Sequence, residues 1–167
     1  MQKCLIFSDS HGLALARMRR VIEMHRDAQV VFFLGDGLSE AEALVPMFPD
    51  RAFLFVRGNC DLAPLSAVEE TDAVTLEGVR IVFTHGHKYG AKYSHSGLMA
   101  LAAARGADIC LFGHTHAPME KYCGEGEKPF TLFNPGSIGR PMLSRPTYGL
   151  LTITDGQYLL SHGETDF

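Results

Sequence analysis

Five apolar stretches of this chain end on Asp, Asn or His, and this repeated pattern limits the folds that the chain can adopt. Each stretch has the composition of a buried strand, and each reaches an Asp, Asn or His within two residues: CLIFSD (4–9), VVFFLGD (30–36), AFLFVRGN (52–59), VRIVFTH (79–85) and ICLFGH (109–114). A buried polar side chain without a partner costs a few kcal/mol. Because open α/β sheets bind ligands beyond the carboxyl ends of their strands, the five ends predict one polar site, if the strands share a sheet.

Helical patterns separate the first strands. Apolar residues recur at helical spacing from Gly12 to Arg26, and a shorter helical stretch runs from Ser39, as its N-cap, to Met47. This alternation of strand and helix predicts a parallel sheet.

The second half of the chain has a different pattern. Two extended runs around Glu77-Gly78 predict a hairpin within 73–85, and a helix from about Ser94 to Arg105 follows. After residue 115 the pattern is that of strands throughout. The chain shows no repeat, low-complexity tract or linker, and 167 residues suit one core, so we expect a single domain over residues 1–167.

Composition excludes several classes of partner. The formal net charge is −4 and no block of Lys or Arg is present, which disfavours binding to extended nucleic acid. No apolar stretch approaches the ~18 residues that would span a membrane, and the N-terminus has no signal-peptide layout. The four cysteines lack CxxC spacing and are expected to be reduced thiols. We therefore expect a cytoplasmic location and no membrane partner, and we leave homo-oligomerisation open.

The side chains at the predicted strand ends have the chemistry of metal ligands. They are Asp9, His11, Asp36, Asn59, His85, His87, His114 and His116. Each alone has an ordinary structural explanation, and His25, His95 and His162 are left with that explanation. Gathered in one pocket, however, these groups require cations, and oxygen and imidazole donors with a carboxylate able to bridge suit a pair of divalent metals. Thiolate is not an obvious ligand, so a structural zinc site is disfavoured.

The motifs D-x-H, GD, GN-x-D, HGH and GHTH, in this order, resemble the calcineurin-like metallophosphoesterase superfamily. GNCD, THGH and NPGSIGRP (134–141) resemble its small YfcE-type phosphodiesterases. The resemblance covers nearly the whole chain. It implies an α/β fold in which a two-sheet β-sandwich is flanked by helices, as four αββα layers.

The resemblance also implies the ligands and the reaction. One metal would be held by Asp9, His11, Asp36 and His116, and the second by Asp36, Asn59, His85 and His114, with Asp36 bridging. His87 would support the ligands without binding metal, and Asp61 would orient a histidine. A hydroxide bridging the two cations would attack phosphorus in line. Mn²⁺ is the metal we expect, and Ni²⁺, Fe²⁺, Co²⁺ or Zn²⁺ would also suit the site.

Cys60 departs from the family pattern, because many relatives carry a His here that protonates the leaving oxygen. A missing general acid typically costs ~10²–10⁴-fold in rate. We therefore expect phosphodiesters with acidic leaving groups, of the aryl or cyclic nucleotide type, to be preferred to alkyl monoesters. Cys60 either donates a proton itself or only packs, and both readings stay open. Asn59 and Arg140 are the expected substrate contacts, and Gly136 is expected to allow a close backbone approach.

Two other functions compete with a phosphodiesterase. A non-catalytic scaffold of the same fold would be expected to lose ligands, whereas each ligand position here is filled. A phosphomonoesterase or phosphoprotein phosphatase is disfavoured by the short chain and by Cys60 at the position of the acid.

Overall fold

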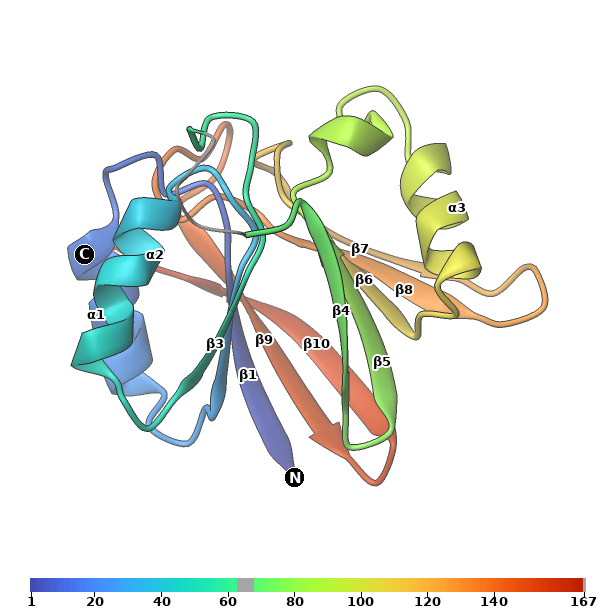
Figure 1. The fold of residues 1–167 in the computed structure, drawn as a ribbon, viewed down its shortest axis with the longest axis horizontal. Coiled ribbons are helices and arrows are strands. Elements are labelled where there is room, and N and C mark those ends of the chain that lie inside the picture. The colour runs from blue at the N-terminus through green and yellow to red at the C-terminus, as the bar shows by residue number, and fades with distance from the viewer. Residues whose placement is uncertain (63–67, 167) are drawn as a thin grey trace.

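The structure is a computed structural model that describes residues 1–62 and 68–166, and its described strands form two five-stranded sheets (Figure 1). The first sheet has the order β10-β9-β1-β2-β3, with β1 (Gln2–Phe7), β2 (Val30–Phe33), β3 (Ala52–Phe55), β9 (Thr147–Thr154) and β10 (Gln157–Glu164). The second has the order β4-β5-β6-β8-β7, with β4 (Thr71–Leu76), β5 (Val79–Thr84), β6 (Ile109–Leu111), β7 (Pro118–Cys123) and β8 (Phe130–Pro135).

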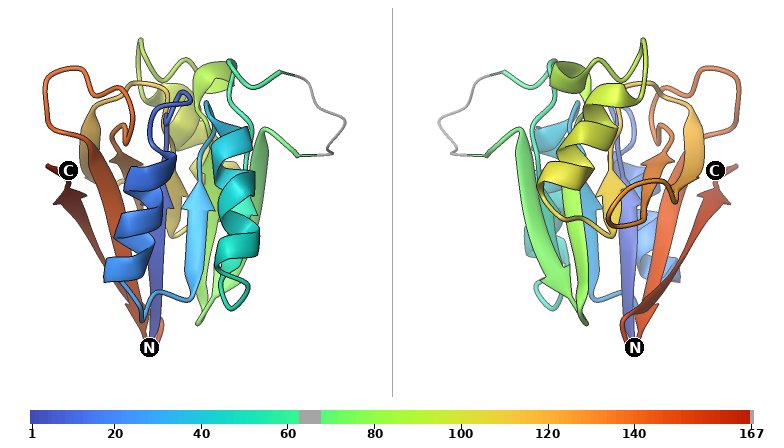
Figure 2. Two further views of the ribbon diagram at one scale, coloured as in Figure 1. Left: turned by 90° about the vertical axis from the view of Figure 1, so that its left-hand side faces the viewer. Right: turned by 90° about the vertical axis from the view of Figure 1, so that its right-hand side faces the viewer.

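Helices cover the outer faces of both sheets. They are α1 (Leu15–Met24), α2 (Leu38–Leu44) and α3 (Ser96–Ala104), with the short 3₁₀ helices η1 (Val45–Met47) and η2 (His87–Tyr89). The first two lie against the first sheet and α3 lies against the second (Figures 1 and 2). The layers are therefore helix, sheet, sheet and helix, which confirms the predicted fold class.

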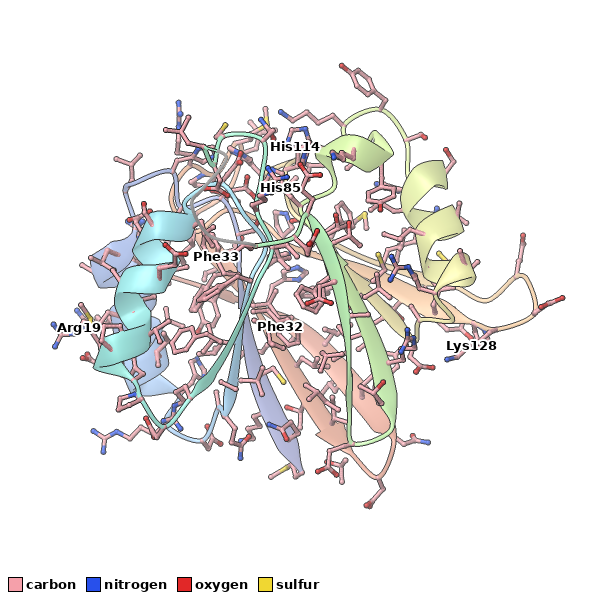
Figure 3. All side chains as sticks on the ribbon, in the orientation of Figure 1. Arg19, Phe32, Phe33, His85, His114 and Lys128 are labelled. Carbon is pink, nitrogen blue, oxygen red and sulfur yellow. The ribbon has the colours of Figure 1, made fainter. Side chains whose placement is uncertain are left out.

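The core strands are apolar on both faces because each face meets another layer. In β1, Ile6 packs into the core between the sheets, whereas Leu5 packs against the helices. In β2, Phe32 packs into the core between the sheets and Phe33 packs against the helices (Figure 3). The rings of Phe32 and Phe83 meet across the two sheets, edge to face, with centroids 5.2 Å apart. Such a pair contributes about 0.5–1.5 kcal/mol beyond its buried area.

The parallel pairing that the sequence predicts is present, but the five strands do not share one sheet. β1, β2 and β3 pair in parallel in the first sheet, whereas β5 and β6 pair in parallel in the second. The polar strand ends nevertheless meet, because the two sheets pack face to face with these carboxyl ends at the same edge, which is uppermost in Figure 1. The predicted hairpin is formed by β4 and β5.

Two helix starts differ from the predictions. α1 begins at Leu15 rather than Gly12, and α2 is preceded by Gly37 rather than capped by Ser39. The N-cap residues, Ala14 and Gly37, have no side-chain acceptor, and carboxylates from other parts of the chain bind the free amides instead, as described below. Among the described residues, none of the helices has the length and apolarity that a membrane crossing requires.

Candidate metal centre

Five of the predicted ligands have left-handed backbone conformations. They are Asp9 (φ 55°), His11 (φ 49°), Asp36 (φ 58°), His114 (φ 67°) and His116 (φ 58°). This region is uncommon for residues other than glycine and costs about 1–3 kcal/mol each. The other non-glycine residues with positive φ in the described chain, Glu77 and Asp155, lie in hairpin turns. Backbone strain of this kind gathers at functional sites, where the surrounding structure holds it in place.

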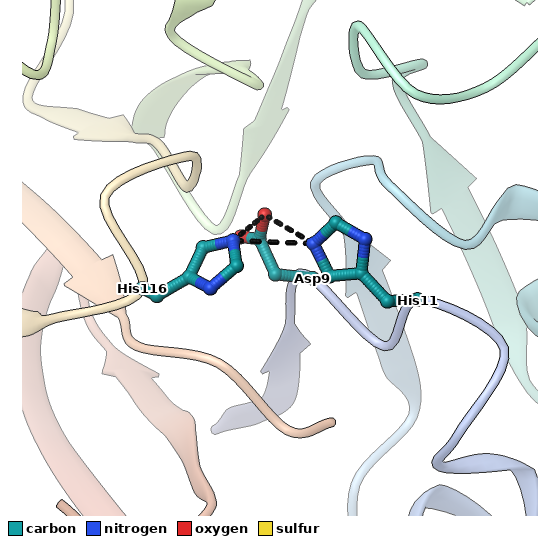
Figure 4. Close-up of side chains that lie close together, drawn as sticks. All are labelled: Asp9, His11 and His116. Carbon is teal, nitrogen blue, oxygen red and sulfur yellow. Dashed lines mark hydrogen bonds and ion pairs between the residues drawn. The ribbon is translucent and has the colours of Figure 1, made fainter. Parts of the chain in front are cut away.

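The first cluster of ligand atoms comes from Asp9, His11 and His116 (Figure 4). The Nε2 atom of His116 lies 3.1 Å from Oδ1 of Asp9 and 3.1 Å from Nε2 of His11. The Nε2 atom of His11 is 3.6 Å from the same carboxylate oxygen. Two imidazole nitrogens and one carboxylate oxygen thus face a common point.

The second cluster joins Asp36, His85 and His114, whose ligand atoms lie within 4.8 Å of one another. Oδ2 of Asp36 is 3.4 Å from Nε2 of His85, and the rings of His85 and His114 have centroids 5.0 Å apart (Figure 3). The same Oδ2 is 3.8 Å from Nε2 of His11, which belongs to the first cluster. The carboxylate of Asp36 therefore lies between the two clusters.

Unpartnered buried atoms show that the two clusters suit cations. Oδ1 of Asp9 and Nε2 of His85 are buried and have no hydrogen-bond partner in the part of the chain that the structure describes. The other ring nitrogens are fixed, since Nδ1 of His85 donates to the carbonyl of Leu34 at 2.7 Å and Nδ1 of His116 donates to that of Arg140 at 2.7 Å. These bonds leave each Nε2 as the free ligand atom, which is how proteins orient histidines around metals. Oxygen and imidazole donors together fit divalent first-row metals.

The two carboxylates remain ionised at neutral pH. Burial alone would raise the pKa of Asp9, but the neighbouring imidazoles of His11 and His116 hold it well below its usual range. Burial opposes the same change in Asp36, but the adjacent imidazole of His85 nevertheless lowers the pKa of this carboxyl to about 2. Burial lowers the pKa of His114 to about 4, so this imidazole is neutral, as a metal ligand must be.

Two motif glycines let the backbone approach the carboxylates. A Cβ atom on Gly58 would lie 2.1 Å from Oδ1 of Asp36. A Cβ atom on Gly113 would lie 2.0 Å from Oγ of Ser8 and 2.8 Å from Oδ2 of Asp9. Both positions therefore require glycine, because a side chain there would displace a predicted ligand.

Asp61 does not orient a histidine, so this prediction is wrong. Its Oδ2 atom accepts hydrogen bonds from the backbone amides of Gly58 (2.7 Å) and Asp36 (2.8 Å). Its Oδ1 atom accepts from those of Gly37 (2.8 Å) and Leu38 (2.9 Å). The first amides of a helix lack hydrogen-bond acceptors within the helix. Asp61 supplies these acceptors for α2 from a loop that is distant in the sequence.

Replacing Asp61 with Ala is expected to lower the free energy of unfolding by about 3 kcal/mol, because four backbone amides lose a charged acceptor. Urea unfolding of the metal-free protein measures this loss. Asp50→Ala is the matched control, since Asp50 is exposed and pairs with the neighbouring Arg51 at 3.3 Å. It should change stability by less than about 0.5 kcal/mol. Equal effects of the two substitutions would contradict the capping role.

Asn59 and Cys60 lie at the open side of the site. Both are exposed, and Nδ2 of Asn59 is 3.5 Å from Sγ of Cys60. The amide of Cys60 donates to Oδ1 of Asp36 at 2.8 Å, and its Sγ lies within 4.8 Å of ligand atoms of Asp36 and His11. Burial and the adjacent Asp36 raise the pKa of the Cys60 thiol. Cys60 is therefore not a core packing residue but a protonated thiol facing the site.

A pocket of about 450 Å³ adjoins the site. It is lined by His11, Gly12, Asp36, Gly37, Leu38, Ser39, Glu42, Cys60, Asp61 and Leu62. The pocket therefore joins the predicted ligands to the N-terminal end of α2.

The structure places His87 and Arg140 beside the clusters. The ring of His87 lies 5.4 Å from that of His85 between centroids, and its Nε2 is 3.6 Å from Oε1 of Glu70. Arg140 is exposed and holds His116 through its backbone carbonyl. A contact between the Arg140 guanidinium and phosphate stays a prediction.

Two buried residues of the NPGS segment hold the ligand loops by hydrogen bonds, although the sequence pattern did not predict this role for them. Asn134 donates from Nδ2 to the carbonyl of Gly113 at 2.9 Å, and its Oδ1 accepts from the amide of Gly136 at 2.9 Å. Ser137 donates from Oγ to the carbonyl of Asp9 at 2.7 Å. A signal was present, because Asn134 also follows an apolar run. Gly136 does allow a close approach, but to Thr147, whose Oγ1 would lie 2.0 Å from an added Cβ.

The histidines that were given structural explanations have partners outside the clusters. Nε2 of His25 lies 2.9 Å from the Tyr148 hydroxyl, and Nε2 of His162 donates to the carbonyl of Asn134 at 2.7 Å. The ring of His95 lies against Phe112, with centroids 6.0 Å apart.

The sequence of the chain identifies the protein family to which this site belongs. Residues 2–156 match the calcineurin-like phosphoesterase superfamily domain. The chain is a member of this superfamily. The membership confirms the predicted family and the predicted class of enzyme, a metal-dependent phosphoesterase.

Two curated bacterial proteins are similar over most of their length. The probable metallophosphoesterase YsnB of Bacillus subtilis is 34% identical over 151 residues, which cover 89% of this chain and 83% of YsnB. The phosphodiesterase YfcE of Escherichia coli K12 is 31% identical over 173 residues, which cover 90% of this chain and 88% of YfcE.

Solved structures share the fold. A predicted phosphoesterase from Streptococcus pneumoniae superposes with a TM-score of 0.79 at 27% identity, covering 96% of this chain and 88% of its own. Vps29 of Entamoeba histolytica, solved with Zn²⁺, superposes with a TM-score of 0.72 at 20% identity, covering 97% and 98%. At that identity, the second likeness concerns the fold alone.

Proposed function

We propose that this phosphoesterase is a dinuclear-metal phosphodiesterase of small substrates. The observation that carries the proposal is the position of the Asp36 carboxylate, which lies 3.4 Å from Nε2 of His85 in one cluster and 3.8 Å from Nε2 of His11 in the other. A carboxylate between two sets of imidazoles is the arrangement expected of a bridging ligand. The name of the relative YfcE, a phosphodiesterase, supports the same reaction.

The proposed ligand sets follow the two clusters. Asp9, His11, Asp36 and His116 would hold one divalent cation, and Asp36, His85 and His114 would hold the second, with Mn²⁺ as the metal we propose. Asn59, which is exposed and lies beside Cys60, is added to the second set from the family resemblance. Such a pair of cations lowers the pKa of a water molecule and neutralises phosphoryl oxygens during an in-line displacement.

The residues of the chain orient this chemistry. Oδ1 of Asp36 is fixed by the Cys60 amide, so its Oδ2 faces the histidines. Asp9 is held in the same way, since its Oδ2 accepts from the Ser8 hydroxyl at 2.5 Å and from the His114 amide at 3.0 Å. Both carboxylates thus present one oxygen to the clusters. His87, beside His85 and Glu70, supports the histidines, and Arg140 is the residue that we expect to bind a phosphate oxygen.

Position 60 supports a preference for diesters with acidic leaving groups. The side chain that faces the clusters there is a thiol rather than an imidazole. An imidazole is the commonest general acid, and a leaving group that departs as a stable anion does not need one. The adjoining pocket of about 450 Å³ suits a small aryl or cyclic nucleotide ester better than an extended nucleic acid.

Metal removal and reloading tests the proposal. Protein stripped with a chelator is expected to lose hydrolysis of a bis-aryl phosphodiester and to regain it with Mn²⁺, in proportion to a content of about two metals per chain. The matching aryl monoester, assayed on the same samples, should be hydrolysed more slowly. Activity that persists in metal-free protein would contradict the mechanism, and faster monoester hydrolysis would contradict the substrate preference.

A non-catalytic scaffold is the second candidate, because the fold alone does not establish catalysis. The filled ligand positions and the unpartnered Oδ1 of Asp9 weigh against it. A protein that bound two metals but hydrolysed neither the diester nor the monoester would support the scaffold.

A further inference from the structure

We propose that Glu40 is a positioning residue for the cluster of Asp9, His11 and His116. It acts through the backbone of residues 12–15, since its carboxylate binds the turn that follows His11. The proposal rests on the proposed function of this cluster as a metal site. Glu40 lies outside every motif on which the family resemblance rests.

The contacts of Glu40 are three hydrogen bonds to one short segment. Its Oε2 accepts from the amide of Gly12 at 2.8 Å, and its Oε1 accepts from those of Ala14 at 2.9 Å and Leu15 at 2.8 Å. Hydrogen bonds to an ionised acceptor are about twice as strong as neutral ones. Ala14, the local N-cap of α1, has no side-chain acceptor to offer. Glu40 therefore caps α1 from α2, with its negative charge at the positive end of the helix dipole.

The capped turn begins with strained residues. His11 (φ 49°) and Gly12 (φ 75°) are consecutive left-handed residues, and Asp9 (φ 55°) is two positions earlier. Non-glycine residues keep this conformation only where neighbouring groups hold them. The amide of His11 donates to the carbonyl of Asp36 at 2.9 Å, which fixes the turn before Gly12. The hydrogen bonds of Glu40 hold the segment that follows His11, so the backbone of His11 is held on both sides.

Glu40 also connects two ligand loops. Asp61 binds the amides of Asp36 and Leu38 at the start of α2, and Glu40 lies in the first turn of the same helix. α2 is thereby attached to the GNCD loop at its beginning and to the turn after His11 through Glu40. The position of the His11 ring relative to Asp36 depends on both attachments. Losing Glu40 would release the His11 turn alone.

A purely structural cap would stabilise α1 without affecting the metal site, and a metal titration separates the two roles. We would titrate ¹⁵N-labelled protein with chelator-buffered Zn²⁺ and follow the ring signals of four histidines by NMR: His11, His85, His114 and His116. In Glu40→Ala, the signals of His11 and His116 should respond at about 10–100-fold higher free Zn²⁺ than in the wild type. Those of His85 and His114 should respond within about threefold of the wild-type concentration.

Two further variants sharpen the comparison. Glu40→Gln keeps one acceptor oxygen but loses the charge and the second acceptor, so its shift should lie between those of wild type and Glu40→Ala. Ile22→Val removes one methylene from the buried side of α1, within the apolar cluster between the helices and the first sheet. It should lower the unfolding temperature while all four histidines titrate as in the wild type.

Several outcomes would overturn the proposal. Wild-type titration of His11 and His116 in both Glu40 variants would show a structural cap only. A uniform shift of all four histidines, or an equal shift in Ile22→Val, would show general destabilisation. If the wild-type histidines did not respond to Zn²⁺ at all, the metal function itself would fail, and this proposal with it.

Discussion

Asp36→Asn is expected to lower both metal affinity and diesterase activity by more than about 100-fold. Losing a residue that only supports ligands already costs about 10–100-fold, and a bridging ligand contributes to both sites. Oδ1 of Asp36 accepts from the Cys60 amide at 2.8 Å, so an asparagine would place its carbonyl oxygen there and turn its NH₂ group towards the histidines. The substitution thus replaces the anionic ligand atom with a donor that cannot bind a cation, and it preserves the anchoring hydrogen bond.

Metal content per chain and bis-aryl phosphodiester hydrolysis, measured on the same reloaded sample, test this expectation. Asp27→Asn is a matched control, because Asp27 is exposed and pairs with Lys3 away from the clusters. It should retain full metal content and activity. Two metals per chain in Asp36→Asn would refute the bridging role.

Cys60→His is expected to raise phosphomonoesterase activity relative to diesterase activity by about 10²-fold, the lower end of what a general acid contributes. Cys60 is exposed and lines a pocket of about 450 Å³, so an imidazole can be accommodated without repacking the core. The backbone amide at this position is held by Asp36, so the new ring would project from a fixed point beside the clusters. An alkyl monoester should gain most, because its leaving oxygen needs the proton most.

Cys60→Ser is the control for size and should leave the ratio of monoester to diester hydrolysis near the wild-type value. Metal content must be measured in each variant, since Sγ of Cys60 lies within 4.8 Å of ligand atoms of His11 and Asp36 and a histidine could add a ligand. An unchanged ratio at equal metal content would mean that position 60 does not control protonation of the leaving group.

The alternation of strands and helices could be predicted from the sequence because it depends on local periodicity. β1, β2 and β3 are short apolar runs, and the segments between them carry helical spacing, so their parallel pairing followed from pattern alone. The candidate ligands could be predicted for a related reason. Polar residues directly after buried strands violate the apolar pattern, and a violation repeated at five strand ends marks a site.

The supporting residues could not be predicted in this way. Asp61 lies 23 to 25 positions from the α2 amides that it binds, and Glu40 lies 25 to 28 positions from the α1 amides. Local sequence patterns predicted Ser39 as the N-cap of α2 and Gly12 as the start of α1. Both predictions were wrong because the capping carboxylates belong to residues that are distant in the sequence.

The order of elements and the residues that gather at the strand ends could be predicted before folding, since both follow from local spacing and residue chemistry. The packing of the layers revealed that two sheets, rather than one, bring those ends together. It also decided that Asp61 and Glu40 hold the ligand loops. All backbone amides are chemically alike as hydrogen-bond donors. The carboxylate that binds a given amide is therefore determined by how the layers pack.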